Sequence, residues 1–292
     1  MKRVIFVFWC VFCVASVSLF ALETNECGTS ACFKGPVGLQ MYSLRSICEH
    51  DVEAGMKLAA EMGFRYIEAS KLYNVDVKEY RALADKYGLI ICAKNYDFST
   101  FESDAGIDFV IEESKILGNK FAGVAWIPHK APFDEADARR AAAVFNRAGE
   151  RMAKEGLTFV FHNHGFEFQP WKDGKTLFDL LMEETNPDFV SFEMDVLWTI
   201  FPNQDPVALL KKYPNRWKLF HLKDLRGGVE GNLSGHTSVE NDVTLGSGQA
   251  DYPAILKAAQ EAGVEYYFIE DESPRFQEQI PQSLRFLEQI EF

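Results

Sequence analysis

The segment FHNHGFEF (161–168) places two of the six histidines of this 292-residue chain on either side of an asparagine. It continues an apolar run, and side chains on a strand alternate between its two faces. His162 and His164 are therefore expected to point the same way, and Asn163 the other way. Two imidazoles on one face can bind a metal ion or an anion, or transfer a proton. The alternative is that one histidine ends the strand and the other is exposed.

Three later residues extend this candidate site. Asp195, His221 and Glu270 each lie at or near the end of a later apolar run. If these runs are adjacent strands, they and a histidine of the FHNHGFEF segment bring two imidazoles and two carboxylates together. Mixed nitrogen and oxygen ligands suit Mn²⁺, with Mg²⁺, Co²⁺ or Zn²⁺ as alternatives, better than a structural zinc, which usually recruits cysteine. The competing interpretation is that each residue caps a strand or forms a salt bridge.

The elements that must position these residues follow a regular alternation. Short apolar runs alternate with segments that have apolar residues at helical spacing and end in glycine, such as 53–63, 78–88 and 138–156. Strands that alternate with helices predict a parallel sheet, and eight units in this length predict a single-domain (β/α)₈ TIM barrel of the α/β class over residues 36–292. The eight runs are 37–44, 65–70, 89–94, 120–127, 157–164, 189–195, 217–224 and 265–271.

Polar residues gather at the carboxyl ends of these runs, as they do at the mouth of a TIM barrel. A doubly wound open sheet is the structural alternative, but no run is followed by GxGxxG. The loop 226–250 is the longest and is rich in Gly, Ser and Asn, and loops of that length at a barrel mouth are usually functional. The polar and aromatic residues at the ends of the runs are Gln40, Glu68, Lys94, Trp126, His162, His164, Asp195, His221, Lys223 and Glu270.

Composition limits the partners and the location. The net charge of −13 argues against a nucleic-acid partner and makes phosphorylated sugars less favoured substrates. Residues 1–22 combine Lys2 and Arg3 with an apolar stretch, which predicts a signal peptide and a periplasmic or secreted protein. An uncleaved membrane anchor is the alternative. Residues 23–35 are a short tail, in which Cys27 and Cys32 either pair or stay free thiols.

The motifs VFHNHGFEF, FEMDVLW, FHLKD and FIEDE resemble those of the xylose isomerase-like (β/α)₈ superfamily of sugar isomerases and epimerases. The resemblance covers about residues 36–292. It implies that Asp195, His221 and Glu270 are metal ligands from strands six, seven and eight. The chain departs from the family at strand five, where His162 replaces a glutamate that binds metal and moves a proton. It departs again at Trp198, where many epimerases carry a histidine.

The resemblance also implies a mechanism. A metal-bound keto-sugar loses the proton next to its carbonyl, and the metal stabilises the resulting enediolate. Returning the proton to the opposite face gives an epimer, and passing it to the neighbouring carbon gives an isomer. Expelling a β-substituent gives dehydration or glycoside cleavage. Glu270 is the expected base, and His162 is the expected second base, since an imidazole transfers protons near neutral pH.

Three functions remain open at this level. The leading hypothesis is a metal-dependent isomerase or epimerase of a neutral carbohydrate. The closest rival is a lyase or dehydratase of a 3-keto-sugar or keto-glycoside, because the two histidines around Asn163 resemble the arrangement in inosose dehydratases. The third is a non-catalytic carbohydrate-binding barrel. A metal-dependent endonuclease of the same superfamily is disfavoured by the acidic charge.

The remaining candidates would contact a small-molecule sugar substrate. Lys223 shares a face with His221 and is expected to bind a hydroxyl or protonate a leaving oxygen, unless it is only solvated. Trp126 and Trp198 are expected to offer apolar faces to a sugar ring, unless they belong to the core. Glu167 is expected to orient His164, unless it simply faces solvent. The other expected substrate contacts are His164, Gln40 and Glu68, and an oligomer is compatible with the sequence.

Overall fold

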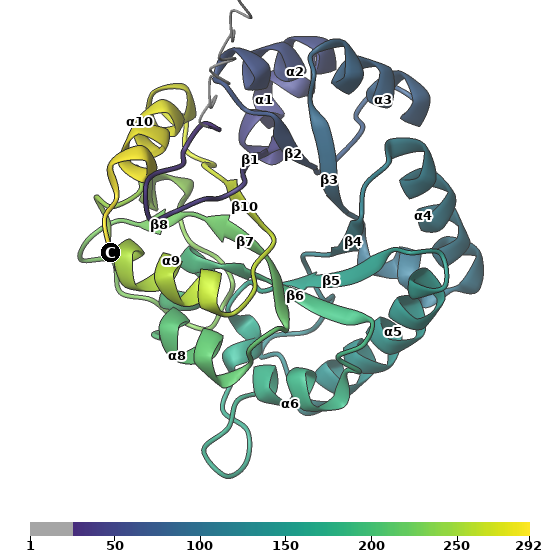
Figure 1. Ribbon diagram of the computed structural model, residues 1–292. Helices are drawn as coiled ribbons and strands as arrows, with labels where there is room; N and C mark the ends of the chain where they lie inside the picture. Colours follow the sequence, from purple (N-terminus) through teal and green to yellow (C-terminus); the bar gives the residue numbers. More distant parts are fainter. Residues whose placement is uncertain (1–25) are drawn as a thin grey trace, which may run out of the picture.

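The computed structural model describes residues 26–292, in which eight parallel strands form a closed barrel (Figure 1). The barrel closes because β1 pairs with both β2 and the last barrel strand, β10. The predicted (β/α)₈ architecture is confirmed. The barrel strands are β1 (Val37–Gln40), β2 (Tyr66–Ala69), β3 (Ile90–Asn95), β4 (Phe121–Val124), β5 (Thr158–His162), β6 (Val190–Asp195), β7 (Trp217–Leu222) and β10 (Tyr266–Ile269).

Each predicted run overlaps one barrel strand, and most strands are shorter than their runs. The run 37–44 differs most, because its second half is the 3₁₀ helix η1 (Met41–Leu44). The side-chain oxygen of Gln40 accepts a hydrogen bond of 3.1 Å from the amide of Tyr42, which turns the chain out of the strand. A polar residue at the end of β1 therefore also starts the following helix.

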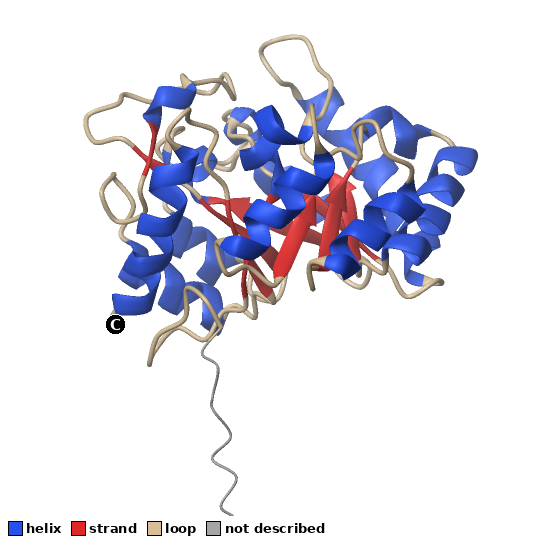
Figure 2. Cartoon of the chain, turned by 90° about the horizontal axis from the view of Figure 1, so that it is seen from above, coloured by secondary structure: helices blue, strands red, loops and turns tan. Residues whose placement is uncertain are grey.

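The helices lie around the strands (Figure 1), and in the perpendicular view of Figure 2 they lie in front of and beside them. Three predicted helices end as expected, because Gly63, Gly88 and Gly156 follow α2, α3 and α5 with positive φ angles of 96°, 70° and 78°. The helices are α1 (Arg45–Cys48), α2 (Val52–Glu61), α3 (Val77–Lys86), α4 (Asp104–Leu117), α5 (Glu135–Ala153), α6 (Leu177–Glu184), α7 (Val196–Ile200), α8 (Pro206–Lys212), α9 (Tyr252–Glu261) and α10 (Phe276–Gln289), with 3₁₀ turns η2 (Phe98–Glu102), η3 (Phe166–Phe168) and η4 (Val239–Asn241).

The barrel interior changes from apolar to polar along the strands. A cluster of buried apolar side chains fills the barrel below its mouth, and its members include Val160, Leu219 and Phe268. Two residues further along the chain from each of these three, the inward positions are His162, His221 and Glu270. The apolar cluster thus forms a floor, and the titratable side chains lie above it at the mouth, where the strands end.

The long loop after β7 is fixed to the barrel by a carboxylate. It contains the two-residue strands β8 (Asp224–Leu225) and β9 (Asp242–Val243), which pair in antiparallel fashion. The side chain of Asp224 accepts hydrogen bonds from the amides of Gly246, Gly248 and Ala250 at 2.9, 3.0 and 3.1 Å. The loop is therefore held as a defined part of the mouth.

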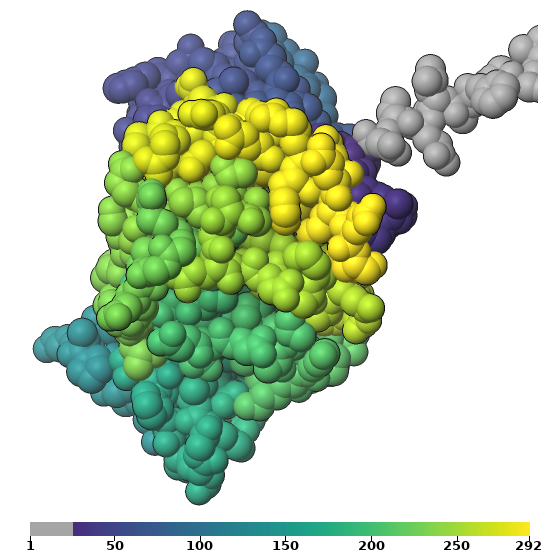
Figure 3. All heavy atoms as spheres, turned by 90° about the vertical axis from the view of Figure 1, so that its left-hand side faces the viewer, coloured from purple at the N-terminus to yellow at the C-terminus, as the bar shows by residue number. Residues whose placement is uncertain are grey.

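The N-terminal tail packs against the other end of the chain. Phe33 is fully buried with its ring edge-on to Tyr267, and the side chains of Ser30 and Cys32 donate to the carbonyl of Ile290 at 3.1 Å. Figure 3 shows the purple N-terminal segment beside the yellow C-terminal one. Cys27 and Cys32 carry free thiols, so the pairing considered from the sequence is not formed.

Residues 1–25 lie outside the described part of the chain, and so does the predicted signal peptide. The periplasmic or secreted location stays a prediction. Within residues 26–292, no helix combines the length and apolar character needed to cross a membrane.

Candidate functional site

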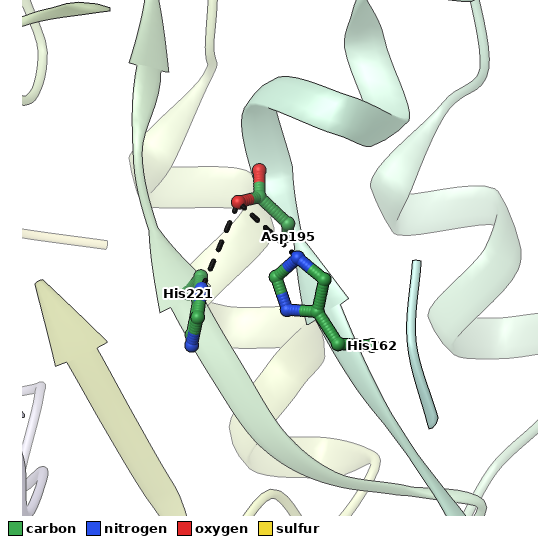
Figure 4. Close-up of side chains that lie close together, drawn as sticks. All are labelled: His162, Asp195 and His221. Atoms are coloured by element: carbon green, nitrogen blue, oxygen red, sulfur yellow. Dashed lines mark ion pairs between the residues drawn. The ribbon is translucent and has the colours of Figure 1, made fainter. Parts of the chain in front are cut away.

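A buried cluster at the mouth contains the residues predicted from strands five, six and seven. The Oδ2 atom of Asp195 lies 3.9 Å from Nε2 of His162 and 3.8 Å from Nδ1 of His221 (Figure 4). All three side chains are buried, and their ligand atoms lie close enough together to hold one metal ion. Strand register explains the meeting, because Asp195 pairs with His221 across β6 and β7 and His162 pairs with Glu193 across β5 and β6.

The two oxygens of Asp195 have different surroundings. Its Oδ1 atom accepts a 2.9 Å hydrogen bond from the amide of Trp198 and caps α7. Its Oδ2 atom is buried and has no hydrogen-bond partner. An unpartnered buried carboxylate oxygen between two imidazole nitrogens is costly unless a cation lies there. The arrangement therefore fits a divalent metal ion.

Asn163, which lies between the two histidines of the HNH segment, has a structural role. As predicted from strand alternation, it points away from the two histidines, and its side chain is fully buried. Its Oδ1 atom accepts a 2.9 Å hydrogen bond from the backbone amide of Asp195, and its Nδ2 atom donates to the hydroxyl of Thr199 at 3.2 Å. Asn163 thus holds the backbone that carries Asp195.

Glu193 is the residue that the sequence analysis missed. Its two oxygens contact Nδ1 of His162 at 3.1 Å and Nε2 of His221 at 3.2 Å. Burial opposes its ionisation, but His221 and His162 lower the pKa of Glu193 to about 2. The sequence does contain a signal that Glu193 belongs to the site. It lies two residues before Asp195, which puts both carboxylates on the same face of β6.

Glu68 has a different position from the one expected. It has no exposed surface, and its Oε2 atom lies 2.7 Å from Nε2 of His221, beneath the mouth. Its Oε1 atom accepts a 2.5 Å hydrogen bond from Asn95. Burial and the charge of Glu193 raise the pKa of Glu68 to about 8. The structure therefore places Glu68 behind His221 rather than at the surface that a substrate reaches.

These contacts determine which nitrogen of each histidine faces the metal position. Nε2 of His221 faces Glu68 and Glu193, which leaves Nδ1 toward Asp195 and toward Oε2 of Glu270 at 3.2 Å. Nδ1 of His162 faces Glu193, which leaves Nε2 toward Asp195. Carboxylates that accept from the outer nitrogen of a histidine ligand fix its tautomer and orientation.

Glu270 and Lys223 form an ion pair beside this cluster. The Nζ atom of Lys223 lies 3.1 Å from Oε2 of Glu270 and 2.5 Å from Oε1 of Glu272, and Asp242 is 3.8 Å away. Burial disfavours the ammonium, but these carboxylates hold the pKa of Lys223 well above its usual value. Burial likewise disfavours the carboxylate, but Lys223 and His221 hold the pKa of Glu270 well below its usual range. A buried proton donor and a buried carboxylate are therefore adjacent.

His164 lies above His162 with the two predicted tryptophans. Its ring stacks on Trp198 with centroids 5.2 Å apart and meets Trp126 edge-on at 5.4 Å. Its Nδ1 atom is buried without a hydrogen-bond partner, and burial together with the charges of His162 and Lys223 keeps the pKa of His164 well below its usual value. Glu167 accepts a 2.8 Å hydrogen bond from the backbone amide of His164, so it fixes the backbone rather than the ring.

One cavity opens onto the cluster, and a second adjoins it at His164 and Glu272. The inner cavity has a volume of about 280 Å³ and is lined by Gln40, Tyr42, Ser70, Asn95, Ala125, His162, His164, His221, Glu270 and Glu272. The roof cavity, of about 210 Å³, lies between the two tryptophans and the loop after β7. Lys94, also at a strand end, turns outward instead and pairs with Glu113 of α4 at 3.1 Å.

Comparison with known proteins identifies the family. The sequence pattern of the xylose isomerase-like TIM barrel matches residues 56–290. The chain belongs to this family. It is 33% identical over 132 residues to an inosose dehydratase of Geobacillus thermodenitrificans, which is 42% of this chain and 43% of the dehydratase. This xylose isomerase-like barrel therefore spans about half the length of the dehydratases it matches.

Solved structures agree on the fold. A sugar phosphate isomerase/epimerase from Parabacteroides distasonis is 27% identical, with a TM-score of 0.72 over 88% of this chain and 95% of that one. The IOLI protein, solved with a bound zinc atom, is 14% identical, with a TM-score of 0.67 over 86% of this chain and 95% of that one. At that identity the second likeness concerns the fold alone.

Proposed function

We propose that this xylose isomerase-like barrel is a metal-dependent dehydratase or lyase of an uncharged keto-sugar. The residues that would hold the ion are His162 through Nε2, Asp195 through Oδ2, His221 through Nδ1 and Glu270 through Oε2. The support for a metal is the unpartnered Oδ2 atom of Asp195 between the two imidazoles. The mixed nitrogen and oxygen ligands favour Mn²⁺ or a similar divalent ion.

A bound ion would supply Lewis acidity, which would ease loss of the proton next to the carbonyl of a keto-sugar. Glu270 takes that proton. Its low pKa keeps it ionised, and its position on the wall of the inner cavity gives it access to a sugar. Glu193 and Glu68 keep His162 and His221 in place and do not touch the substrate.

The observation that favours elimination is the 3.1 Å contact between Lys223 and Glu270. Elimination needs a base for the α proton and an acid for the leaving oxygen. This pair supplies both, with Glu270 on the wall of the inner cavity and Lys223 buried beside it. Lys223 donates a proton to the departing hydroxyl or glycosidic oxygen. The inosose dehydratases among the relatives support the same reaction class.

The second candidate is the isomerase or epimerase that the sequence analysis ranked first. Its support is that His162 ends β5, Glu270 directly follows β10, and both line the inner cavity. Epimerisation uses a base on each face of the carbon. The sugar phosphate isomerase/epimerase of Parabacteroides distasonis also supports this reading.

The test is solvent deuterium uptake by keto-sugars and keto-glycosides, followed by NMR with the full chain and Mn²⁺. We expect uptake next to the carbonyl together with loss of a β-substituent. Glu270→Gln should lower uptake by about 10²- to 10⁴-fold. Glu265→Gln, the same substitution just before β10 at the far end of the barrel, should leave it unchanged. Uptake without loss of a substituent favours the isomerase, and binding without uptake favours a carbohydrate-binding barrel.

A further inference from the structure

A larger groove adjoins the inner cavity. It has a volume of about 730 Å³ and runs over the ends of β2, β3 and β4. Ser70, Asn95 and Ala125 line both the groove and the inner cavity, so the two spaces meet. At about 280 Å³ the inner cavity is near the lower end for small-molecule sites, which are about 300–1,000 Å³. The combined space is larger than one sugar ring requires.

One wall of this outer groove is aromatic. Phe109 of α4 is 55% exposed, which is the highest value among the large exposed hydrophobic side chains of residues 26–292. Its ring lies edge-on to Tyr96 with centroids 6.5 Å apart, and Trp126 lines the groove on the side of the roof cavity. Small-molecule sites are lined mainly by hydrophobic and aromatic side chains, and these three residues give the groove such a lining.

The groove has little net charge. The Nζ atom of Lys94 lies 3.1 Å from Oε1 of Glu113 and 3.4 Å from the centroid of the Tyr96 ring, so it is not free for a ligand. The exposed charged residues of the lining are Lys71 and Asp97, which have opposite signs. A phosphate or carboxylate ligand usually requires a cluster of cationic or bidentate donors. The lining suits an uncharged group with a flat apolar face.

We propose that the outer groove binds an uncharged ring attached to the sugar, so that the substrate is a neutral glycoside rather than a monosaccharide or a sugar phosphate. The inference rests on the proposed function, because the attached ring is then part of the group that elimination releases. Phe109 offers its exposed ring to this group, and Tyr96 and Trp126 line the same groove. Contacts between aromatic side chains and a ring of the ligand give specificity without requiring a charged group on the ligand.

The test compares the binding of methyl β-glucoside, phenyl β-glucoside and glucose 6-phosphate to the Mn²⁺-loaded full chain by calorimetry. We expect the phenyl glucoside to bind about tenfold more tightly than the methyl glucoside, which corresponds to burial of one aromatic ring. Phe109→Ser should remove most of that difference and leave the methyl glucoside unchanged. Ile90→Ser, at a 41% exposed position where β3 begins, is the matched control and should preserve the difference.

Equal affinity for the two glucosides, tighter binding of glucose 6-phosphate, or no saturable binding of the phenyl glucoside would each overturn the inference. These glucosides carry no keto group, so the measurement is independent of turnover. A lost preference for the phenyl ring therefore contradicts the groove, whereas absent deuterium uptake by keto-sugars contradicts the proposed reaction.

Discussion

The Nε2 atom of His221 lies 2.7 Å from Oε2 of Glu68, and this contact determines which nitrogen of the imidazole faces the barrel mouth. Glu68 comes from β2, on the opposite side of the barrel order from β6, which carries Asp195. With Nε2 engaged, Nδ1 is the nitrogen that remains for an ion. The orientation of His221 therefore depends on a fully buried side chain that lies outside the lining of the inner cavity.

Glu68→Gln should weaken Mn²⁺ binding although Glu68 is not a proposed ligand. Removing a partner of this kind typically costs about 10- to 100-fold in metal affinity. The measurement is competitive Mn²⁺ titration of the folded variant, with Glu265→Gln as the control. An affinity equal to that of the wild type would show that Glu68 does not position His221.

Asp195 is expected to have two separable roles. Asn caps helices as well as Asp does, so Asp195→Asn should keep the contact with the amide of Trp198 and lose the metal. Asp195→Ala should lose both, and in metal-free protein it should be less stable than Asp195→Asn by about 1 kcal/mol. Denaturant unfolding and Mn²⁺ titration together check this. Equal stability of the two variants would contradict the capping role, and Mn²⁺ binding by either would contradict the ligand role.

Lys223→Met should separate the two halves of the reaction. Deuterium uptake next to the carbonyl should continue, because Glu270 keeps its carboxylate, while loss of the β-substituent slows by about 10²-fold or more. Lys218→Met on the same strand should change neither rate. If both rates of Lys223→Met stay at the wild-type level, Lys223 is not the acid and the elimination proposal loses its support.

The carboxyl group of Asp179, which lies far from the barrel mouth, should make the stability of the fold depend on pH. Burial opposes its ionisation, but Lys212 at 2.8 Å, Tyr213 at 2.5 Å and the Thr176 amide at 2.9 Å lower the pKa of its carboxyl. A pKa lowered by folding gives stability that is present above the unfolded value of about 3.9 and is lost as pH falls through the folded value.

Asp179→Asn should therefore cost about 1–2 kcal/mol at pH 7, and the difference from the wild type should shrink below about pH 4. Half-exposed Lys212 contributes little of this, because solvent screens its charge. Urea unfolding from pH 7 to pH 3 gives the two curves. A difference that is constant or grows toward low pH has the wrong sign for a lowered pKa.

The fold was predictable because its signals are local. Eight apolar runs each overlap a barrel strand, and glycines with positive φ end helices where the sequence places them. The boundaries were less predictable. Gln40 ends β1 because its side chain caps η1, and an apolar run such as 37–44 carries no sign of that contact.

In the candidate site, the sequence predicts only those positions that follow from the alternation of side chains along a strand. His162, Asp195 and His221 meet because their strands are adjacent and in register. The partnership of Glu193 with both histidines depends on that same register, which a single sequence does not reveal. Lys94 points outward because Asn95 is the inward residue at the end of β3. The sequence of an apolar run with a polar end does not show which of these two neighbouring polar residues faces the barrel interior.

The most direct test of the account is a crystal of the full chain soaked in Mn²⁺ and measured at a wavelength that gives anomalous scattering from manganese. We expect one peak at the mouth, within about 2–2.6 Å of Asp195 Oδ2, His162 Nε2, His221 Nδ1 and Glu270 Oε2, the range of divalent-ion contacts. A map without a peak there, or with these four side chains pointing to different places, would contradict the proposed metal centre.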